Sequence, residues 1–303
     1  MQKILFLKHN RIDYQKWDNC IKRAPNGNLY SNSWYLNIAC PGWNALVTEN
    51  YDTVMPLPVR KKLSFSYVFQ PFFVQQLGVF SVKPVTEEIL IGFIKAIPKS
   101  ISYVDYNLNF KNNELPDCFT FVKNTTYHLR LNADYKEIAH NYAENTRRNI
   151  RKAEKAKLTI KKDLKPSEIV EFKKRTAKAD LDSDGYKRLQ KLISWSVKYD
   201  SGRIYGACDS DGNLCAAVFF AFSHNYSYML VSASDNIGKE ASAMFLLINN
   251  FIYEFSGKNL TLDFEGSNIP GIARFFAGFG ATPVYYHKYK LNRLPKILKR
   301  LKK

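Results

Sequence analysis

Two acidic side chains are predicted to share one face of a short strand. The segment 259–265 alternates polar and apolar residues strictly, which places Asp263 and Glu265 on the same side, about 7 Å apart. Burying two acids is costly unless they are paired or functional. A partly buried carboxylate can take the proton that an ammonium loses before an amine is acylated. Both are therefore candidate catalytic residues; the alternative is a buried ion pair with Arg147 or Arg274 that orients the site without reacting.

Arginines repeat along a long predicted helix. Apolar spacing predicts this helix over 133–157, and its C-terminal half carries Arg147 and Arg151 at i, i+4 spacing, with Arg148 beside them. The planar guanidinium fork suits phosphate and carboxylate, so these three are candidate phosphate ligands. The helix macrodipole favours each cation near a C-terminus by about 0.3–1 kcal/mol, which accounts for some of them without a ligand.

The net charge of +18 is concentrated in two segments. Residues 144–178 carry thirteen Lys/Arg against five Asp/Glu, and residues 288–303 carry eight Lys/Arg and no acid. This concentration indicates an anionic partner, namely a phosphate-bearing cofactor, RNA or an acidic membrane surface; the alternative is lysine-rich solvated helix faces. The tail 291–303 places apolar residues on one stripe amid six basic ones, which predicts an amphipathic helix that lies on an anionic membrane or packs on its own domain. The stripe consists of Leu291, Leu294, Ile297, Leu298 and Leu301.

Composition narrows the class of protein. The 303 residues predict about two domains, and 46% hydrophobic with 15% aromatic residues can fill their cores. Five scattered cysteines without a CxxC motif favour a reduced, cytoplasmic protein. No apolar run approaches the roughly 18 to 20 residues of a membrane span, and the N-terminal one is too short for a signal peptide. The five histidines show no ligand spacing, so no metal site is expected.

The order of predicted elements indicates an α+β fold. After residue 203 we expect three antiparallel strands, a helix, a strand, a helix and a last strand. The first half repeats this order less cleanly. We therefore expect an N-terminal domain over 1–123, a C-terminal domain over 124–290 and a basic amphipathic tail over 291–303. The predicted elements of the second half are strands at 203–208, 214–222, 226–232 and 284–286 and helices at 167–178, 186–199 and 240–255.

The chain resembles the GNAT acyltransferase fold, and two copies in one chain resemble the Fem family. The segments that carry the likeness are Thr146–Ala153, Leu262–Ser267, Ile272–Phe276 and Phe279–Ala281. Fem proteins transfer amino acids from aminoacyl-tRNA to peptidoglycan precursors, whereas other GNAT proteins use acyl-CoA. The resemblance thus implies two tandem GNAT-like domains, acyl-CoA or aminoacyl-tRNA as donor, and a phosphate-bearing, lipid-linked or other anionic acceptor of the cell envelope.

The resemblance assigns further residues to the site. The loop before the central helix of an acyl-CoA-type GNAT protein holds pyrophosphate, and here it matches only at Gly238, followed by Lys239. Tyr228 would flank the acyl group, although it is also typical of a core. Gln75 and Gln76 lie where the halves would meet, and predict either a polar groove or a solvated loop.

Three hypotheses follow. The first is an N-acyltransferase or aminoacyltransferase in which the acidic strand end and the arginine-rich helix converge on a single cleft. The second is a non-catalytic RNA-binding protein that keeps the fold and the charge. The third is a peripheral membrane protein, on the inner face of the membrane, that depends on residues 291–303.

Overall fold

A computed structural model describes residues 3–62, 64–177, 181–266 and 268–295. The chain divides into two compact units, of which unit 1 comprises Met1–Asn124 and Tyr285–Lys303 and unit 2 comprises Thr125–Val284. We expected the second domain to continue to residue 290. The residues from Tyr285 instead belong to unit 1, because β14 (Thr282–Asn292) pairs antiparallel with β7 (Ile101–Asn107).

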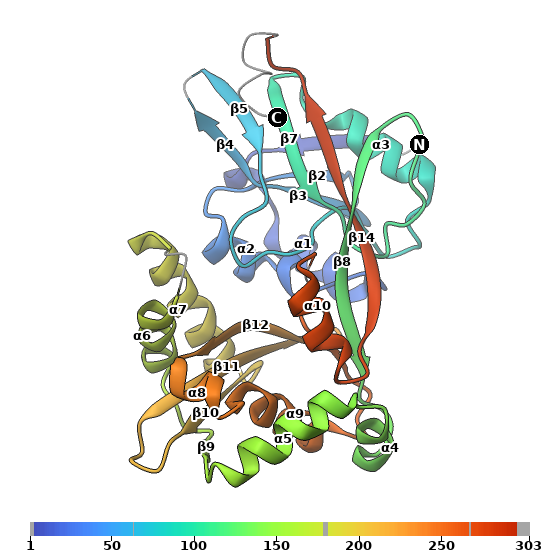
Figure 1. The fold of residues 1–303 in the computed structure, drawn as a ribbon. Coiled ribbons are helices and arrows are strands. Elements are labelled where there is room, and N and C mark those ends of the chain that lie inside the picture. Colours follow the sequence, from blue (N-terminus) through green and yellow to red (C-terminus); the bar gives the residue numbers. More distant parts are fainter. Residues whose placement is uncertain (1–2, 63, 178–180, 267, 296–303) are drawn as a thin grey trace. The chain divides into compact units, whose positions relative to one another are not determined.

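A sheet in the order β8-β13-β12-β11-β10-β9 forms the centre of unit 2 (Figure 1). Its neighbours run antiparallel except β12 and β13, which are parallel and joined through helix α9. The strands are β8 (Thr120–Arg130), β9 (Thr159–Lys161), β10 (Gly202–Cys208), β11 (Leu214–Ser223), β12 (Tyr226–Ser234) and β13 (Thr261–Asp263). The helices are α4 (Tyr135–His140), α5 (Glu144–Lys155), α6 (Pro166–Thr176), α7 (Ser183–Lys198), α8 (Asn236–Glu240), α9 (Ala243–Phe255) and α10 (Pro270–Ala277).

Helices cover both faces of this sheet. Helix α9 fills the core on one face, where the ring of Phe251 stacks on that of Phe220 with centroids 3.8 Å apart, and α5 packs beside it. Helices α6 and α7 cover the other face, where a Cβ on Gly202 would lie 2.8 Å from both Phe219 and Ser196. A residue's position along a strand therefore decides which helices it meets.

The predicted helix over 133–157 is two helices, α4 and α5. Ala143 adopts an extended conformation between them, and its N–H donates to the carbonyl of Gly278 at 2.9 Å. Tyr142 packs edge-on against Phe279, and its hydroxyl lies 3.1 Å from Asn249 Oδ1. The sequence around Ala143 has no helix-breaking Gly or Pro. We therefore attribute the break between the two helices to these tertiary contacts.

Two predicted boundaries in unit 2 are also wrong. The strand over 259–265 ends at Asp263, because Glu265 adopts a left-handed conformation with φ of 55°. The helix predicted over 167–178 begins earlier, at Pro166, because Lys165 is the N-cap, and its N–H donates to Glu168 Oε2 at 2.7 Å.

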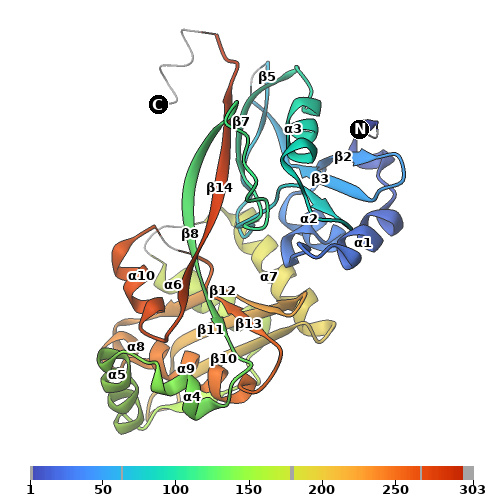
Figure 2. The same ribbon diagram turned by 90° about the vertical axis from the view of Figure 1, so that its right-hand side faces the viewer.

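Unit 1 contains two strand groups, ordered β1-β2-β3-β6 and β4-β5-β7-β14. Figure 2 shows β7 beside β14 in this unit. Helix α3 lies against β1, and the indoles of Trp17 and Trp43, both fully buried, meet edge to face with ring centroids 4.7 Å apart. The strands are β1 (Ile4–Leu7), β2 (Asn44–Thr48), β3 (Thr53–Leu57), β4 (Val59–Lys62), β5 (Phe65–Val68) and β6 (Phe80–Ser81), and the helices are α1 (Tyr14–Arg23), α2 (Ser33–Ala39) and α3 (Glu87–Ala96).

The tail prediction fails where the structure describes it. Leu291 and Asn292 are the last residues of β14, and the N–H of Arg293 donates to the carbonyl of Ser102 at 2.7 Å. These residues are therefore not part of an amphipathic helix. The remainder of that prediction, residues 296–303, lies outside the described residues.

Candidate functional site

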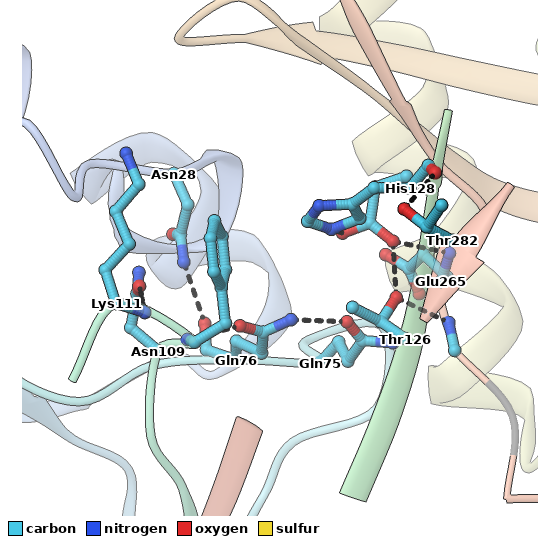
Figure 3. Close-up of polar contacts among 12 residues, drawn as sticks. Asn28, Gln75, Gln76, Asn109, Lys111, Thr126, His128, Glu265 and Thr282 are labelled. Atoms are coloured by element: carbon cyan, nitrogen blue, oxygen red, sulfur yellow. Dashed lines mark hydrogen bonds and ion pairs between the residues drawn. The ribbon is translucent and has the colours of Figure 1, made fainter. Parts of the chain in front are cut away.

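The buried carboxylate of Asp263 joins the end of β13 to β8 and to the turn that follows. Asp263 is 2% exposed, and its Oδ1 accepts from the hydroxyl of Thr126 at 2.6 Å and from the N–H of Glu265 at 2.8 Å. Its Oδ2 lies 3.3 Å from Nε2 of His128. Thr126 and His128 both belong to β8, and Figure 3 shows them close to Glu265. The partner of Asp263 is thus a histidine and a hydroxyl, and not Arg147 or Arg274.

A second hydrogen bond fixes the turn after β13. Thr126 Oγ1 accepts from the N–H of Gly266 at 3.0 Å while its own hydrogen goes to Asp263. Glu265 is half-buried, and its left-handed backbone turns its side chain away from the alternation of the strand. The two acids therefore do not share a strand face: Asp263 is the last residue of β13, whereas Glu265 belongs to the turn that follows the strand.

Two tyrosines of β12 complete this group. Tyr228 is 4% exposed and lies opposite Asp263 in the parallel register. The ring of Tyr226 meets the imidazole of His128 edge to face, with centroids 5.5 Å apart. Burial and the negative charge of Asp263 raise the pKa of Tyr226, so its hydroxyl stays protonated at neutral pH and can donate.

Beyond these residues, the edge of β12 that faces β13 is unpaired among the described strands. Among the described strands, β13 stops opposite Tyr228, whereas β12 continues to Ser234. A bulge between Met229 and Val231 interrupts the pairing with β11 on the other side. A strand edge of this kind presents backbone N–H and C=O groups to an extended ligand.

A lysine from α6 reaches this part of β12. Lys173 Nζ donates to the carbonyl of Ser232 at 3.0 Å. Burial lowers the pKa of Lys173. The amino group of Lys173 is thus partly buried and is held by a backbone carbonyl of β12.

The arginines of α5 make contacts within their own helical segment. Arg147 Nη2 donates to the carbonyl of His140 at 2.5 Å, and Arg151 Nη2 lies 2.9 Å from Glu144 Oε1. Arg148 contacts Asn145 Oδ1 at 2.8 Å. All three side chains stay exposed, so a phosphate would compete with surface contacts of little energetic weight.

The carboxylates and the arginines do not converge on one cleft. Ile150 of α5 belongs to the same core as Leu262 and Phe264, on the α9 face of the sheet. Asp263 alternates with those two residues and points to the opposite face. The helix instead meets the start of α9, where the hydroxyl of Ser242 donates to Asn149 Oδ1 at 2.8 Å.

The other predicted ligands of unit 2 are dispersed. A Cβ on Gly238 would lie 2.1 Å from the carbonyl oxygen of Cys215, and its N–H donates to Asp235 at 2.9 Å. Close packing against Cys215 is therefore enough to require glycine at position 238, whether or not a pyrophosphate binds there. Lys239 is exposed on α8, and Arg274 is exposed on α10.

The glutamines of unit 1 belong to a buried network. Gln76 is 2% exposed; its Nε2 donates to Gln75 Oε1 at 2.7 Å, and its Oε1 accepts from the N–H of Phe110 at 2.8 Å. Asn107 and Asn28 donate to the backbone carbonyls of the two glutamines. A solvated loop is therefore the wrong interpretation of this cluster, and its role in substrate binding stays a prediction.

Potential metal-ligating side chains are not clustered in the part of the chain that the structure describes. In that part of the chain, no three His, Cys, Asp or Glu side chains gather in a way that could hold a metal ion. Burial raises the pKa of the Cys215 thiol to about 11, so it stays protonated and unreactive. None of the described helices is long and apolar enough to cross a bilayer.

Comparison with known proteins identifies the fold. No family model matches the sequence, and no curated protein matches it significantly. FemX matches 99% of this chain over 100% of its own length, with 13% identity and a TM-score of 0.66. L-PGS from Bacillus licheniformis covers 95% of both chains at 11% identity and a TM-score of 0.55. A tandem GNAT protein from the clavulanic acid biosynthesis pathway covers 97% of this chain and 100% of its own, with 11% identity and a TM-score of 0.53.

The chain has a tandem GNAT fold. The predicted α+β architecture of two such domains is confirmed, and at these identities the likeness concerns the fold alone. Within this fold the sequence-based search missed His128, Thr126 and Lys173. The alternation Thr126-Tyr127-His128 places two polar residues on one strand face and is a local signal for the first two. Lys173 has no such signal, because it is one of several basic residues on α6.

Proposed function

We propose that the protein is an acyltransferase or aminoacyltransferase that modifies an amine, with its reacting centre at the end of β13. The observation that carries this proposal is the buried pair of His128 and Asp263, 3.3 Å apart, beside the open edge of β12. A titratable pair held by a buried hydroxyl at a strand end is a typical arrangement for moving a proton.

The pair would take the proton that the attacking ammonium must lose. His128 accepts it on the imidazole, and Asp263 stabilises the resulting imidazolium as a fixed counter-ion. The amine nitrogen then attacks the donor carbonyl, a C–N bond forms, and the bond to the leaving sulfur or oxygen breaks. As the amide forms, the nitrogen loses a second proton, which the hydroxyl of Tyr226 relays to the leaving group, and the imidazolium of His128 returns its own proton to solvent. Glu265 stands on the turn above, where a carboxylate attracts the incoming ammonium.

The donor would lie along β12. The backbone N–H groups near the bulge at Leu230 can hold the acyl carbonyl, and the ammonium of Lys173 can hold a polar group farther along. The phosphates of an acyl-CoA or an aminoacyl-tRNA would then reach the start of α9 and Arg148 on α5. The separation of arginines and carboxylates by the sheet is compatible with an acyl-CoA donor, because the pantetheine arm of that donor holds the pyrophosphate far from the reacting carbonyl.

The fold relatives and the charge support one class of acceptor. The structure of FemX and that of L-PGS, a synthetase, share the fold, which supports an aminoacyl donor and an acceptor from the cell envelope that carries a phosphate. The excess of positive charge, +18, fits an anionic acceptor or tRNA.

A transfer assay tests the proposal. Acyl-CoAs and aminoacyl-tRNAs are offered in parallel with a soluble amine, and the purified protein should transfer from one donor class. His128→Gln should abolish this transfer while the melting temperature and the donor-induced rise in it persist, since binding to the native state alone raises stability. Salt-dependent RNA binding with no transfer from any donor would contradict the proposal and support the RNA-binding hypothesis.

A further inference from the structure

One end of unit 1 gathers basic residues from three segments that are distant in the sequence. In the strand registers Lys62 pairs with Phe65, Ser66 with Ile101, and Asn292 with Tyr103. The end of β4, the starts of β5 and β7 and the end of β14 therefore meet at the same end of the sheet.

The cations at this end are exposed. We name as the basic end the six side chains Arg60, Lys61, Lys62, Lys95, Lys99 and Arg293, all of which are exposed. No described residue forms an ion pair with any of the four lysines within 4.0 Å. The surrounding sequence, 59–68, 92–104 and 291–303, contains no Asp or Glu. The basic end is therefore a strongly positive surface without internal compensation.

The chain continues from this end with the same character. The N–H and guanidinium of Arg293 contact backbone carbonyls at the start of β7, which fixes the exit of the chain here. The residues that follow Pro295 are Lys-Ile-Leu-Lys-Arg-Leu-Lys-Lys, five cations and three apolar residues. Cations interleaved with aliphatic residues suit the boundary between lipid headgroups and acyl chains.

We propose that the basic end is a docking surface for a bilayer of anionic lipids. Lysine predominates in it, and a compact ammonium attracts a diffuse negative surface, whereas paired recognition of single phosphates favours the arginine fork. The aliphatic residues of the following segment add a contact that a nucleic-acid backbone does not offer. This surface keeps the protein on the inner face of the membrane, and it acts whether or not unit 2 transfers acyl groups.

Co-sedimentation with lipid vesicles tests the surface on the full chain. The protein should bind vesicles of phosphatidylcholine that contain phosphatidylglycerol, should bind vesicles of phosphatidylcholine alone weakly, and should dissociate with rising salt. Replacing Lys61, Lys62 and Lys99 by Gln should weaken partitioning by about fivefold per charge, or roughly 100-fold together. The matched control replaces three exposed lysines of unit 2 by Gln, Lys136, Lys191 and Lys198, and should bind as the unmodified protein does.

Neutral changes separate lipid from RNA. Ile297→Asn, Leu298→Asn and Leu301→Asn keep the charge, so they should weaken vesicle binding and leave binding to an RNA duplex unchanged. Equal losses in the basic-end and control variants, no binding to anionic vesicles, or a basic-end variant that loses only RNA binding would each overturn the proposal. Transfer to a soluble amine serves as an independent readout, and the basic-end variant should retain it.

Discussion

The two units carry different chemistry at corresponding places. In each, a helix leads into a strand that pairs in parallel: α3 into β7 beside β5, and α9 into β13 beside β12. At the end of that strand unit 1 has Asn107 and Asn109, and unit 2 has Asp263 and Glu265. The same i, i+2 positions thus hold neutral amides in one unit and carboxylates in the other.

The contacts of these residues explain the difference. Asn109 Nδ2 donates to the carbonyl of Asn26 at 2.8 Å, and Asn107 Nδ2 donates to that of Gln75 at 2.8 Å. Amides that bind backbone carbonyls keep the same hydrogen bonds at every ordinary pH. Asp263 instead meets a hydroxyl and an imidazole, of which the imidazole is titratable. The position holds a fixed amide network in unit 1 and a titratable pair in unit 2, and we propose that only unit 2 uses it for a reaction.

The largest expected effect separates chemistry from structure in unit 2. His128→Gln and Asp263→Asn should each lower kcat by about 100- to 10,000-fold, because the proton acceptor or its counter-ion is lost. Steady-state kinetics with the active donor measure this. If both variants were as active as the unmodified protein, His128 and Asp263 would have no role in the reaction.

An intermediate effect is expected for Thr126→Val. The variant loses the hydroxyl that joins Asp263 to the N–H of Gly266, so two buried groups lose a partner. The free energy of unfolding should fall by about 1–3 kcal/mol, with a decrease in kcat. Urea unfolding gives the first quantity. Thr126→Ser, which keeps the hydroxyl, should restore most of kcat.

The matching change in unit 1 should affect stability alone. Asn109→Leu removes a buried donor and leaves the carbonyl of Asn26 without this bond, at a cost of about 1–3 kcal/mol in unfolding free energy. Transfer per folded molecule should not change. A loss of kcat at full folding would break the proposed division of roles between the units.

The smallest expected effect concerns pH. Burial and the positive charge of Lys123 lower the pKa of His287 from its ordinary value of 6.5. The unfolded chain therefore binds this proton first as pH falls. The contribution of the neutral imidazole is complete above pH 6.5 and is lost as pH falls from there through the lower folded pKa. His287→Asn should flatten this part of the stability profile, as urea unfolding at neutral and mildly acidic pH would show.

Local patterns predicted the elements of unit 2 and one of its acids. Strict alternation placed Asp263 opposite the core residues Leu262 and Phe264, as observed. The same pattern misplaced Glu265, because no local signal marks a left-handed residue just after a strand. The hydroxyl partner of Asp263 lies 137 residues away, and only the pairing of β8 with β13 joins them. Local residue spacing cannot predict a contact between residues so far apart in the sequence.

The arginine-rich helix shows the same limit. Its apolar spacing continues smoothly through Tyr142, and the break at Ala143 depends on the carbonyl of Gly278, far along the chain. Spacing also identified Arg147, Arg148 and Arg151 as neighbours, but gave no indication of which sheet face they would occupy. The sheet face on which α5 lies is set by how the chain connects β8 to β9, and helix spacing carries no information about that connection.

The membership of Tyr285–Lys303 in unit 1 has a consequence for the order in which a newly made chain can fold. Unit 2 is one uninterrupted stretch, whereas β7 receives β14 as its neighbour only after the whole of unit 2 has been synthesised. At about 5–20 residues per second, the ribosome needs roughly 10 to 40 s between these two strands. During that time β7 lacks one of its two neighbouring strands, so unit 1 can be completed only after unit 2 has been made.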